Sequence, residues 1–219
     1  MALAEGLLVA QRDLGMALLL FGSFVSTFYV ATGRRDLIAI ASVLTGIGAY
    51  SCYFYFDHVQ TRVNNWLDPF QDYFGKGFQM CNSLFSLGNG GIDGTGLGLG
   101  QPYLIPDADT DFIFTAVAEE MGLIGAVGLI LILMLLCARS FRVALNAPDE
   151  FGTILASGLA SLWSWQSIIV MLGCTKMMPM TGITLPFVSR GGSSLVANAI
   201  IMAILWRISW PEEDEQNGA

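Results

Sequence analysis

The run MGLIGAVGLILILMLLCA, residues 121–138, decides the fold class of this chain. It holds eighteen consecutive uncharged residues, and Glu119 and Glu120 stand just before it. A bilayer core about 30 Å thick is crossed by about 20 residues of α-helix. Because backbone N–H and C=O groups in lipid must be hydrogen-bonded within their own segment, we predict a membrane-spanning helix over 111–138.

Four further stretches of the same character lie on either side of this run. They are residues 14–33, 37–56, 151–173 and 194–206, the last of which is short unless 191–193 extends it. The composition agrees, because hydrophobic residues make up 54% and charged residues 13% of the chain, with a mean hydropathy of +0.60. Soluble domains carry roughly 25% charged residues. We therefore predict an all-α, polytopic transmembrane helical bundle with five spans.

The connections between the predicted spans give the bundle an orientation. Residues 57–110 and 174–193 form two larger loops, and 33–36 and 139–150 form short links on the opposite side. Apart from the long loop, the short-link side holds Arg34, Arg35, Arg139, Arg142 and Arg207, and the other side holds Arg12, Lys176 and Arg190. Because loops rich in basic residues stay in the cytoplasm, the larger loops are predicted to be extracytoplasmic. In this scheme residues 1–209 form one membrane domain, and 210–219 form an acidic cytoplasmic tail.

The long loop is expected to be structured. Four of its residues recur at helical spacing, which predicts a helix lying at the membrane interface: Phe74, Phe78, Cys81 and Phe85. The glycine-rich stretch 89–100 that follows is predicted to be non-helical. Its spacing does not match a nucleotide-binding motif, and no strand precedes it.

Charge, cysteine and histidine content exclude several classes of function. The formal net charge is −8 with only 10 lysines and arginines and no basic stripe, so we exclude nucleic acid as a partner. The four cysteines lack metal-ligand spacing, although a disulfide between Cys81 and Cys174 stays an open alternative. His58 is the only histidine, which leaves no multi-histidine metal site. No residue is predicted to be a metal ligand.

Two acidic residues are candidates for chemistry because ionisable groups at a bilayer edge are costly unless they face protein or water. Asp111 opens the predicted span, and Glu119 follows eight residues later. On one helix, Glu119 would lie about 80° around from Asp111 and about 12 Å deeper, so both can face one cavity. Alternatively, Asp111 caps the start of the helix. The two interpretations are compatible.

The candidate substrate-binding groups are mainly basic. Arg62 either pairs with Asp57 or Asp68 or clamps a pyrophosphate through bidentate hydrogen bonds. Lys176 and Arg190 flank the second larger loop. Arg190 also precedes Gly191-Gly192-Ser193-Ser194 at a helix start, a pattern of anion sites that a turn with a snorkelling arginine explains equally well.

Five segments carry a family resemblance in the right order. They are QRDLG at 11–15, RVNNWLDP at 62–69, GGIDGTGLG at 90–98, TDFIF with AEEMGL at 110–114 and 118–123, and PMTGITLPFVSRGGSS at 179–194. Together they resemble the motifs of the SEDS family (shape, elongation, division and sporulation), which includes RodA, FtsW and SpoVE. Three positions depart from its pattern: Arg12 replaces a proline, Arg190 replaces a tyrosine, and no lysine precedes Pro106.

The resemblance implies a peptidoglycan glycosyltransferase that polymerises lipid II at the outer face of the bacterial cytoplasmic membrane, beside a class B penicillin-binding protein. It gives Asp111 the role of the family's essential acid, here a general base. Arg62, Lys176, Arg190, Glu119 and Ser193 become the expected substrate contacts, and a divalent cation, Mg²⁺ or Mn²⁺, can assist them. Full members have about ten spans, so the chain is expected to be a truncated, RodA-like C-terminal portion.

Two rival functions remain open at this stage. A transporter that flips a polyprenyl-linked sugar would use the same membrane-embedded acids, with Asp111 as its coupling site. A truncated chain without its early spans would instead be an inactive scaffold.

Overall fold

The computed structural model describes residues 8, 11 and 13–210. The regular secondary structure of this part of the chain is helical, and five of its helices are long and apolar enough to cross a membrane. They are α2 (Leu14–Thr32), α3 (Asp36–Tyr55), α6 (Ile113–Leu145), α7 (Glu150–Cys174) and α8 (Gly192–Ser209). The predicted all-α transmembrane bundle is confirmed. Arg12 and nearly all of the predicted acidic tail lie outside the described residues.

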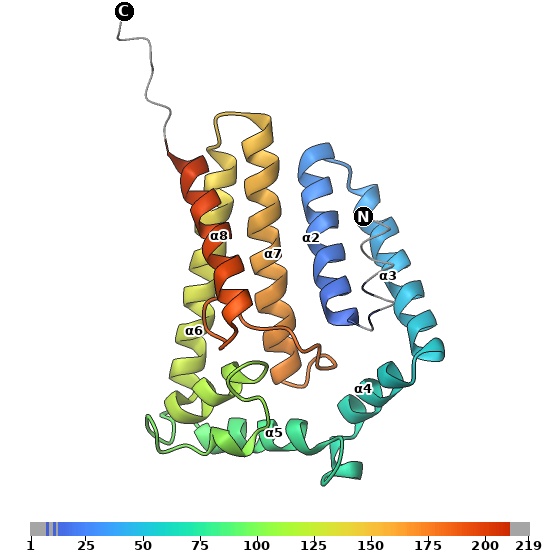
Figure 1. Ribbon diagram of the computed structural model, residues 1–219, viewed down its shortest axis with the longest axis vertical. Helices are drawn as coiled ribbons and strands as arrows, with labels where there is room; N and C mark the ends of the chain where they lie inside the picture. Colours follow the sequence, from blue (N-terminus) through green and yellow to red (C-terminus); the bar gives the residue numbers. More distant parts are fainter. Residues whose placement is uncertain (1–7, 9–10, 12, 211–219) are drawn as a thin grey trace, which may run out of the picture.

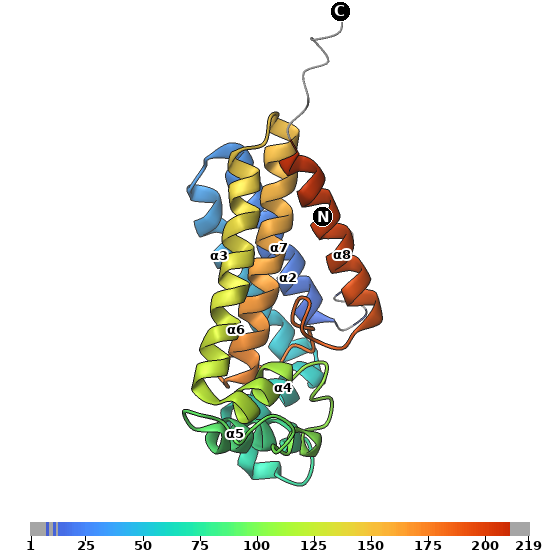
Figure 2. The ribbon, with the colours of Figure 1, turned by 90° about the vertical axis from the view of Figure 1, so that its left-hand side faces the viewer.

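The five long helices run side by side, with α7 at the centre (Figures 1 and 2). It packs against α2 on one side and α6 on the other, and α8 covers both α6 and α7. The indole N–H of the fully buried Trp163 donates to Oδ1 of Asn198 at 2.7 Å, which ties α7 to α8. By contrast, α3 has no buried residue, and its main contacts with another long helix are those with α2.

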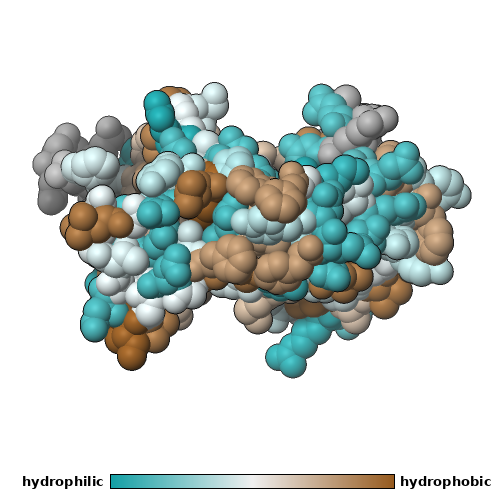
Figure 3. Space-filling model, turned by 90° about the horizontal axis from the view of Figure 1, so that it is seen from below, coloured by the Kyte–Doolittle hydropathy of each residue, from teal (hydrophilic) through white to brown (hydrophobic). Residues whose placement is uncertain are grey.

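The end of the bundle opposite the short links is closed by shorter helices (bottom of Figure 1). They are α4 (Asp57–Leu67), the 3₁₀ turn η1 (Pro69–Asp72), α5 (Phe78–Gly90) and the 3₁₀ turn η2 (Pro102–Leu104). Seen from this end, the surface mixes hydrophilic with hydrophobic side chains (Figure 3). The predicted helix of the long loop is confirmed from Phe78 onward but not at Phe74, which lies in a turn and is 92% exposed.

The cysteines do not form the disulfide that the sequence left open. Cys81 and Cys174 are both free and buried. Each thiol donates instead to a backbone carbonyl at 3.3 Å, Cys81 to Pro69 and Cys174 to Asp111. They therefore act as small packing residues with a weak hydrogen bond.

A break in α6 joins it to the glycine-rich loop. Gly122 has φ 66° and ψ −165°, so the helix is interrupted there. The carbonyls of Glu119 and Glu120 accept from the N–H groups of Thr95 (2.9 Å) and Gly96 (3.0 Å), while the N–H groups of Leu123 and Ile124 donate to the carbonyls of Gly91 (2.9 Å) and Ile92 (3.4 Å). In a regular helix Leu123 would donate to Glu119 and Ile124 to Glu120, so the loop replaces two intrahelical hydrogen bonds and satisfies all four groups.

Candidate active site

A polar pocket of about 150 Å³ lies at the α4–α5 end of the bundle. Arg62 and Asn65 of α4, Lys76 and Gln79 around the start of α5, Asp111 before α6 and Gly182 after α7 contribute to its wall. Asp111 is the only acid among its lining residues, and it shares the pocket with two cationic side chains. Three segments of the chain therefore converge on the segment that carries this carboxylate.

Asp111 lies in a turn, not in the helix. Its N–H donates to the carbonyl of Asp107 at 3.0 Å, and α6 begins only at Ile113. Phe112 occupies the N-cap position, and no side chain caps α6 there. The interpretation of Asp111 as the helix cap was therefore wrong, because one further residue separates it from the first helical turn.

The surroundings of Asp111 favour its protonated form. Partial burial raises the pKa of this half-buried carboxyl above its ordinary value; a hydrogen bond from Thr110 opposes the shift, the nearby Asp107 carboxylate adds to it, and Arg62 opposes it. Asp109, two residues earlier, behaves differently, because a backbone hydrogen bond and the Arg190 guanidinium lower its pKa. Environments that separate the pKa values of neighbouring acids are common at catalytic sites.

Arg62 reaches the pocket from α4. Its Nη1 donates to the carbonyl oxygens of Met180 and Thr181 at 3.4 and 3.3 Å. The predicted pairing with Asp57 or Asp68 is wrong, because the ion pairs within the described part of the chain are Arg34–Asp36 and Arg190–Asp109. With only long hydrogen bonds to neutral carbonyls, the guanidinium retains donors for an anionic ligand.

An apolar cavity of about 560 Å³ adjoins the polar pocket. It runs between α2, α3 and α4 and shares Arg62 and Met180 with the pocket. Leu14, Leu18 and Val59 contribute to its largely hydrophobic wall. A ligand with a charged head and a hydrocarbon chain can therefore place the head beside Asp111 and the chain between helices.

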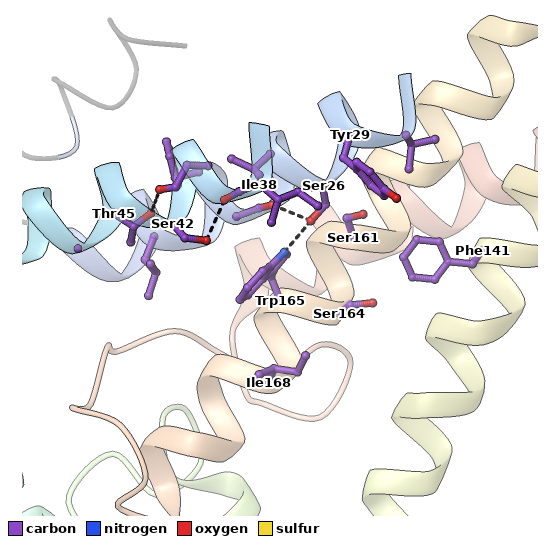
Figure 4. A pocket seen from close by; sticks show the side chains of 17 residues that line it. Ser26, Tyr29, Ile38, Ser42, Thr45, Phe141, Ser161, Ser164, Trp165 and Ile168 are labelled. Carbon is purple, nitrogen blue, oxygen red and sulfur yellow. Dashed lines mark hydrogen bonds between the residues drawn. The ribbon is translucent and has the colours of Figure 1, made fainter. Parts of the chain in front are cut away.

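A third cavity, larger than these two, does not include Asp111 in its lining. It measures about 680 Å³ and lies between α2, α3 and α7 (Figure 4). Its wall is apolar apart from hydroxyl groups and Trp165, whose N–H donates to Oγ of Ser26 at 3.0 Å. Because its lining includes neither a carboxylate nor a basic side chain, we assign it no acid–base chemistry.

Three other expected substrate contacts lie outside the polar pocket. Nζ of Lys176 is 3.5 Å from the carbonyl of Leu67. The exposed Arg190 guanidinium pairs with Asp109 at 3.1 Å. Ser193 is exposed in the first turn of α8.

Glu119 does not share the pocket with Asp111. It is only 2% exposed, and its Oε1 accepts from the N–H of Gln101 at 3.2 Å, next to the break in α6. The estimate that both acids face one cavity assumed a regular helix from Asp111, but the helix starts two residues later. Glu119 instead anchors the segment that follows the glycine-rich loop.

Sequence reasoning missed several pocket residues because it did not identify α4. In a helix over 57–67, residues at i, i+3 and i+4 share a face, which brings Asn65 and Trp66 alongside Arg62. Lys76 and Gln79, around the start of α5, were not predicted to be site residues, although both line the pocket. Pro69 marks the end of α4 and could have indicated the helix.

The pocket residues do not fit a resident divalent cation. The described part of the chain has no group of three or more histidine, cysteine or acidic side chains arranged to hold a metal ion. In the pocket, one carboxylate stands beside two basic side chains. Mg²⁺ and Mn²⁺ prefer several oxygen ligands, so we derive no step through such an ion.

Comparison with known proteins gives one consistent group of relatives. A family model described as "Cell cycle protein", for FtsW, RodA and SpoVE, matches residues 1–214. The chain is 46% identical over 207 residues to the peptidoglycan glycosyltransferase RodA of Mycobacterium tuberculosis, covering 94% of the chain and 44% of that protein. It is 37% identical over 211 residues to a probable peptidoglycan glycosyltransferase FtsW of Geobacter metallireducens, covering 95% of the chain and 56% of that protein. The chain thus spans about half the length of these relatives.

Solved structures agree with the fold. One, from work on the coordination of polymerization and crosslinking by a peptidoglycan synthase complex, superimposes with a TM-score of 0.76 at 28% identity, covering 96% of this chain and 60% of that one. A mutant of the rod-shape-determining protein RodA from Thermus thermophilus gives a TM-score of 0.61 at 27% identity, covering 95% of this chain and 55% of that one.

Proposed function

Because the chain belongs to the FtsW/RodA/SpoVE family, we propose that it carries the catalytic pocket of a peptidoglycan glycosyltransferase that polymerises lipid II. The observation that supports this most is the position of Asp111. A half-buried carboxyl with a raised pKa lines one pocket together with two cationic side chains, and this pocket shares Arg62 and Met180 with an apolar cavity between helices. A prenyl-linked diphosphate sugar has a hydroxyl-bearing sugar for the carboxyl, a diphosphate for the cations and a hydrocarbon chain for the apolar cavity.

In the proposed reaction Asp111 is the general base. Its carboxylate takes the proton from the 4-hydroxyl of the acceptor sugar while that oxygen forms a bond to the anomeric carbon of the donor. The bond from that carbon to the diphosphate oxygen breaks, and undecaprenyl diphosphate leaves with the electron pair. A raised pKa makes the carboxylate a stronger base, and a positioned base contributes about 10²–10⁴-fold in rate.

The leaving diphosphate needs positive charge where its own charge grows. Arg62 and Lys76 supply it from two different segments. The planar guanidinium of Arg62 can bind two phosphate oxygens at once, whereas Lys76 acts as a point charge. Since Arg62 lines both cavities, the diphosphate would sit at their junction with its prenyl chain among apolar side chains.

The same proposal includes a side of the membrane and a partner. The basic residues near the short links favour the cytoplasm for that end of the bundle, so the pocket would face the outer side. The similar solved structure comes from a complex that couples polymerization to crosslinking. A crosslinking enzyme, the class B penicillin-binding protein, is therefore the expected partner.

The test is polymerisation of purified lipid II by the full-length protein and its Asp111→Asn variant. We expect glycan strands from the wild type and a rate lowered by about 10²–10⁴-fold in the variant. The matched control is Asp109→Asn, which changes an exposed carboxylate two residues away and is expected to leave the rate unchanged. Full product from Asp111→Asn would refute the general base. Movement of lipid II across vesicles without any glycan product would favour the transporter instead.

A further inference from the structure

The turn that carries Asp111 is held by a second part of the chain. Three consecutive carbonyls, those of residues 109, 110 and 111, each accept a hydrogen bond from α7 or the loop after it. The donors are the N–H of Arg190 (2.7 Å), the hydroxyl of Ser189 (2.5 Å) and the thiol of Cys174 (3.3 Å). Because Asp111 precedes α6, helical hydrogen bonds do not fix its backbone carbonyl.

Ser189 is the central donor of the three. It is 3% exposed, and its hydroxyl both donates to the carbonyl of Thr110 and accepts from the N–H of Leu185 at 2.7 Å. Thr110 is bonded covalently to Asp111, so this hydroxyl sets the peptide plane that enters the catalytic residue. The thiol is a weaker donor, and the Arg190 donor is a backbone group that no substitution except proline removes.

The loop that carries Ser189 is itself anchored on two long helices. Nε2 of Gln166 in α7 donates to the carbonyl of Thr184 at 2.7 Å, and the hydroxyls of Thr184 and Ser194 in α8 are 2.8 Å apart. Leu185 is 1% exposed. A rigid path therefore runs from the helices through residues 184–189 to the turn before α6.

We propose that Ser189 is a positioning residue, which fixes the direction of the Asp111 side chain without touching substrate. The inference rests on the proposed function, since the position matters only if Asp111 reacts. Ser189 does not line the polar pocket, so it acts through Thr110. A displacement of about 1 Å at a reacting group can lower a rate on the order of 10²-fold.

The first measurement is steady-state polymerisation by full-length Ser189→Ala. We expect kcat to fall roughly 10–100-fold with KM for lipid II within about twofold, because the binding cations stay in place. The acidic midpoint of the kcat–pH profile should also shift, because a displaced Asp111 carboxyl lies at different distances from Asp107 and Arg62, two charged groups that act on its pKa. The matched control is Ser157→Ala, which removes a 2% exposed hydroxyl that donates to Ile154 within α7. Equal losses in both variants, or a rise in KM alone, would overturn the proposal.

A second variant covers the case in which alanine prevents folding. Ser189→Cys keeps a weak donor of similar size, so its kcat should lie between those of serine and alanine. The Ser189→Cys variant decides the matter if the Ser189→Ala protein does not accumulate in the membrane. A normal kcat with an unshifted pH profile in Ser189→Cys would then refute the role of the hydroxyl, and a lowered kcat at unchanged KM would support it.

Hydrogen–deuterium exchange separates this inference from the proposed function. In Ser189→Ala, amides of residues 107–112 should exchange faster, and those in Ser157→Ala should not. If the wild type makes no glycan, the proposed function fails, while faster exchange would still show that Ser189 holds the turn. Unchanged exchange in active Ser189→Ala would overturn the inference alone.

Discussion

Replacing Gly122 by alanine should destabilise the protein strongly, although the site lies in the middle of its longest helix. The backbone there has φ 66° and ψ −165°, a region that is essentially restricted to glycine. A Cβ at this position would overlap the carbonyl oxygen of Ile92 and the amide nitrogen of Gly94. Both are backbone atoms of the glycine-rich loop, so rotating a side chain cannot relieve the overlap.

The size of the effect follows from those contacts. Strain at a glycine-only conformation costs about 1–3 kcal/mol. Moving the loop away would also break the bonds from Leu123 and Ile124 to Gly91 and Ile92, each with a net contribution of about 1 kcal/mol. We expect the free energy of unfolding to fall by about 3–5 kcal/mol in total.

The assay is unfolding in mixed micelles, followed by circular dichroism as denaturing detergent is added. Gly128→Ala is the matched control, because a Cβ at this helical glycine meets nothing within 4 Å. Alanine favours a helix by about 1 kcal/mol over glycine, so this control should be as stable as the wild type or slightly more so. If Gly122→Ala unfolded at the same concentration of denaturing detergent as Gly128→Ala, the glycine-rich loop would not clamp α6 as described.

Three further predictions concern the pocket and the core. The kcat of the wild type should fall as the pH drops through the pKa of Asp111, and because burial raises that pKa, the loss should begin at a higher pH than for an exposed aspartate; a pH profile checks this. Arg62→Ala should raise KM for lipid II and lower kcat, because the guanidinium is proposed to bind the diphosphate and to stabilise its growing charge. Since the guanidinium also lowers the pKa of Asp111, the acidic limb should move to higher pH, and an unchanged KM and kcat would contradict the diphosphate contact. Asn198→Ala leaves the buried indole N–H of Trp163 unpaired, so it should lower the free energy of unfolding by about 1–3 kcal/mol in the same micelle assay, and an unchanged value would show that the indole finds another acceptor.

The long helices were predictable because lipid imposes a simple rule on sequence. A span needs a long uncharged run, and the run from Met121 to Ala138 meets that requirement whatever the packing. The break at Gly122 was not predictable from the same run, because hydropathy is insensitive to backbone dihedrals. Its cause is a loop some 30 residues earlier, which only the three-dimensional structure brings into contact.

The candidate site was predictable only in part. Asp111 stands out because its charge lies beside an apolar span, and Arg62 because a guanidinium can clamp a pyrophosphate; the structure brings both to one pocket. Lys176 and Arg190 stood out because they flank the second larger loop, but they lie outside the pocket, since their side chains face a carbonyl and an exposed carboxylate. Charge at a membrane boundary therefore identifies candidates, whereas the direction of each side chain depends on turns that have no periodic pattern.

The hydrogen bonds that hold the turn before α6 come from uncharged donors, which matters for the pKa of Asp111. Its carbonyls accept from an amide, a hydroxyl and a thiol, all of which are neutral donors. A charged group in the place of Ser189 would hold the turn as well, but it would be buried at a cost of several kcal/mol and would change the pKa of the carboxyl nearby. With neutral donors, the turn is held without adding a charge near the carboxyl, whose pKa depends first on burial and then on Thr110, Asp107 and Arg62. Substitutions at Ser189 should therefore act mainly on kcat, whereas those at Arg62, which is proposed to bind the diphosphate and to stabilise its growing charge, should change both KM and kcat.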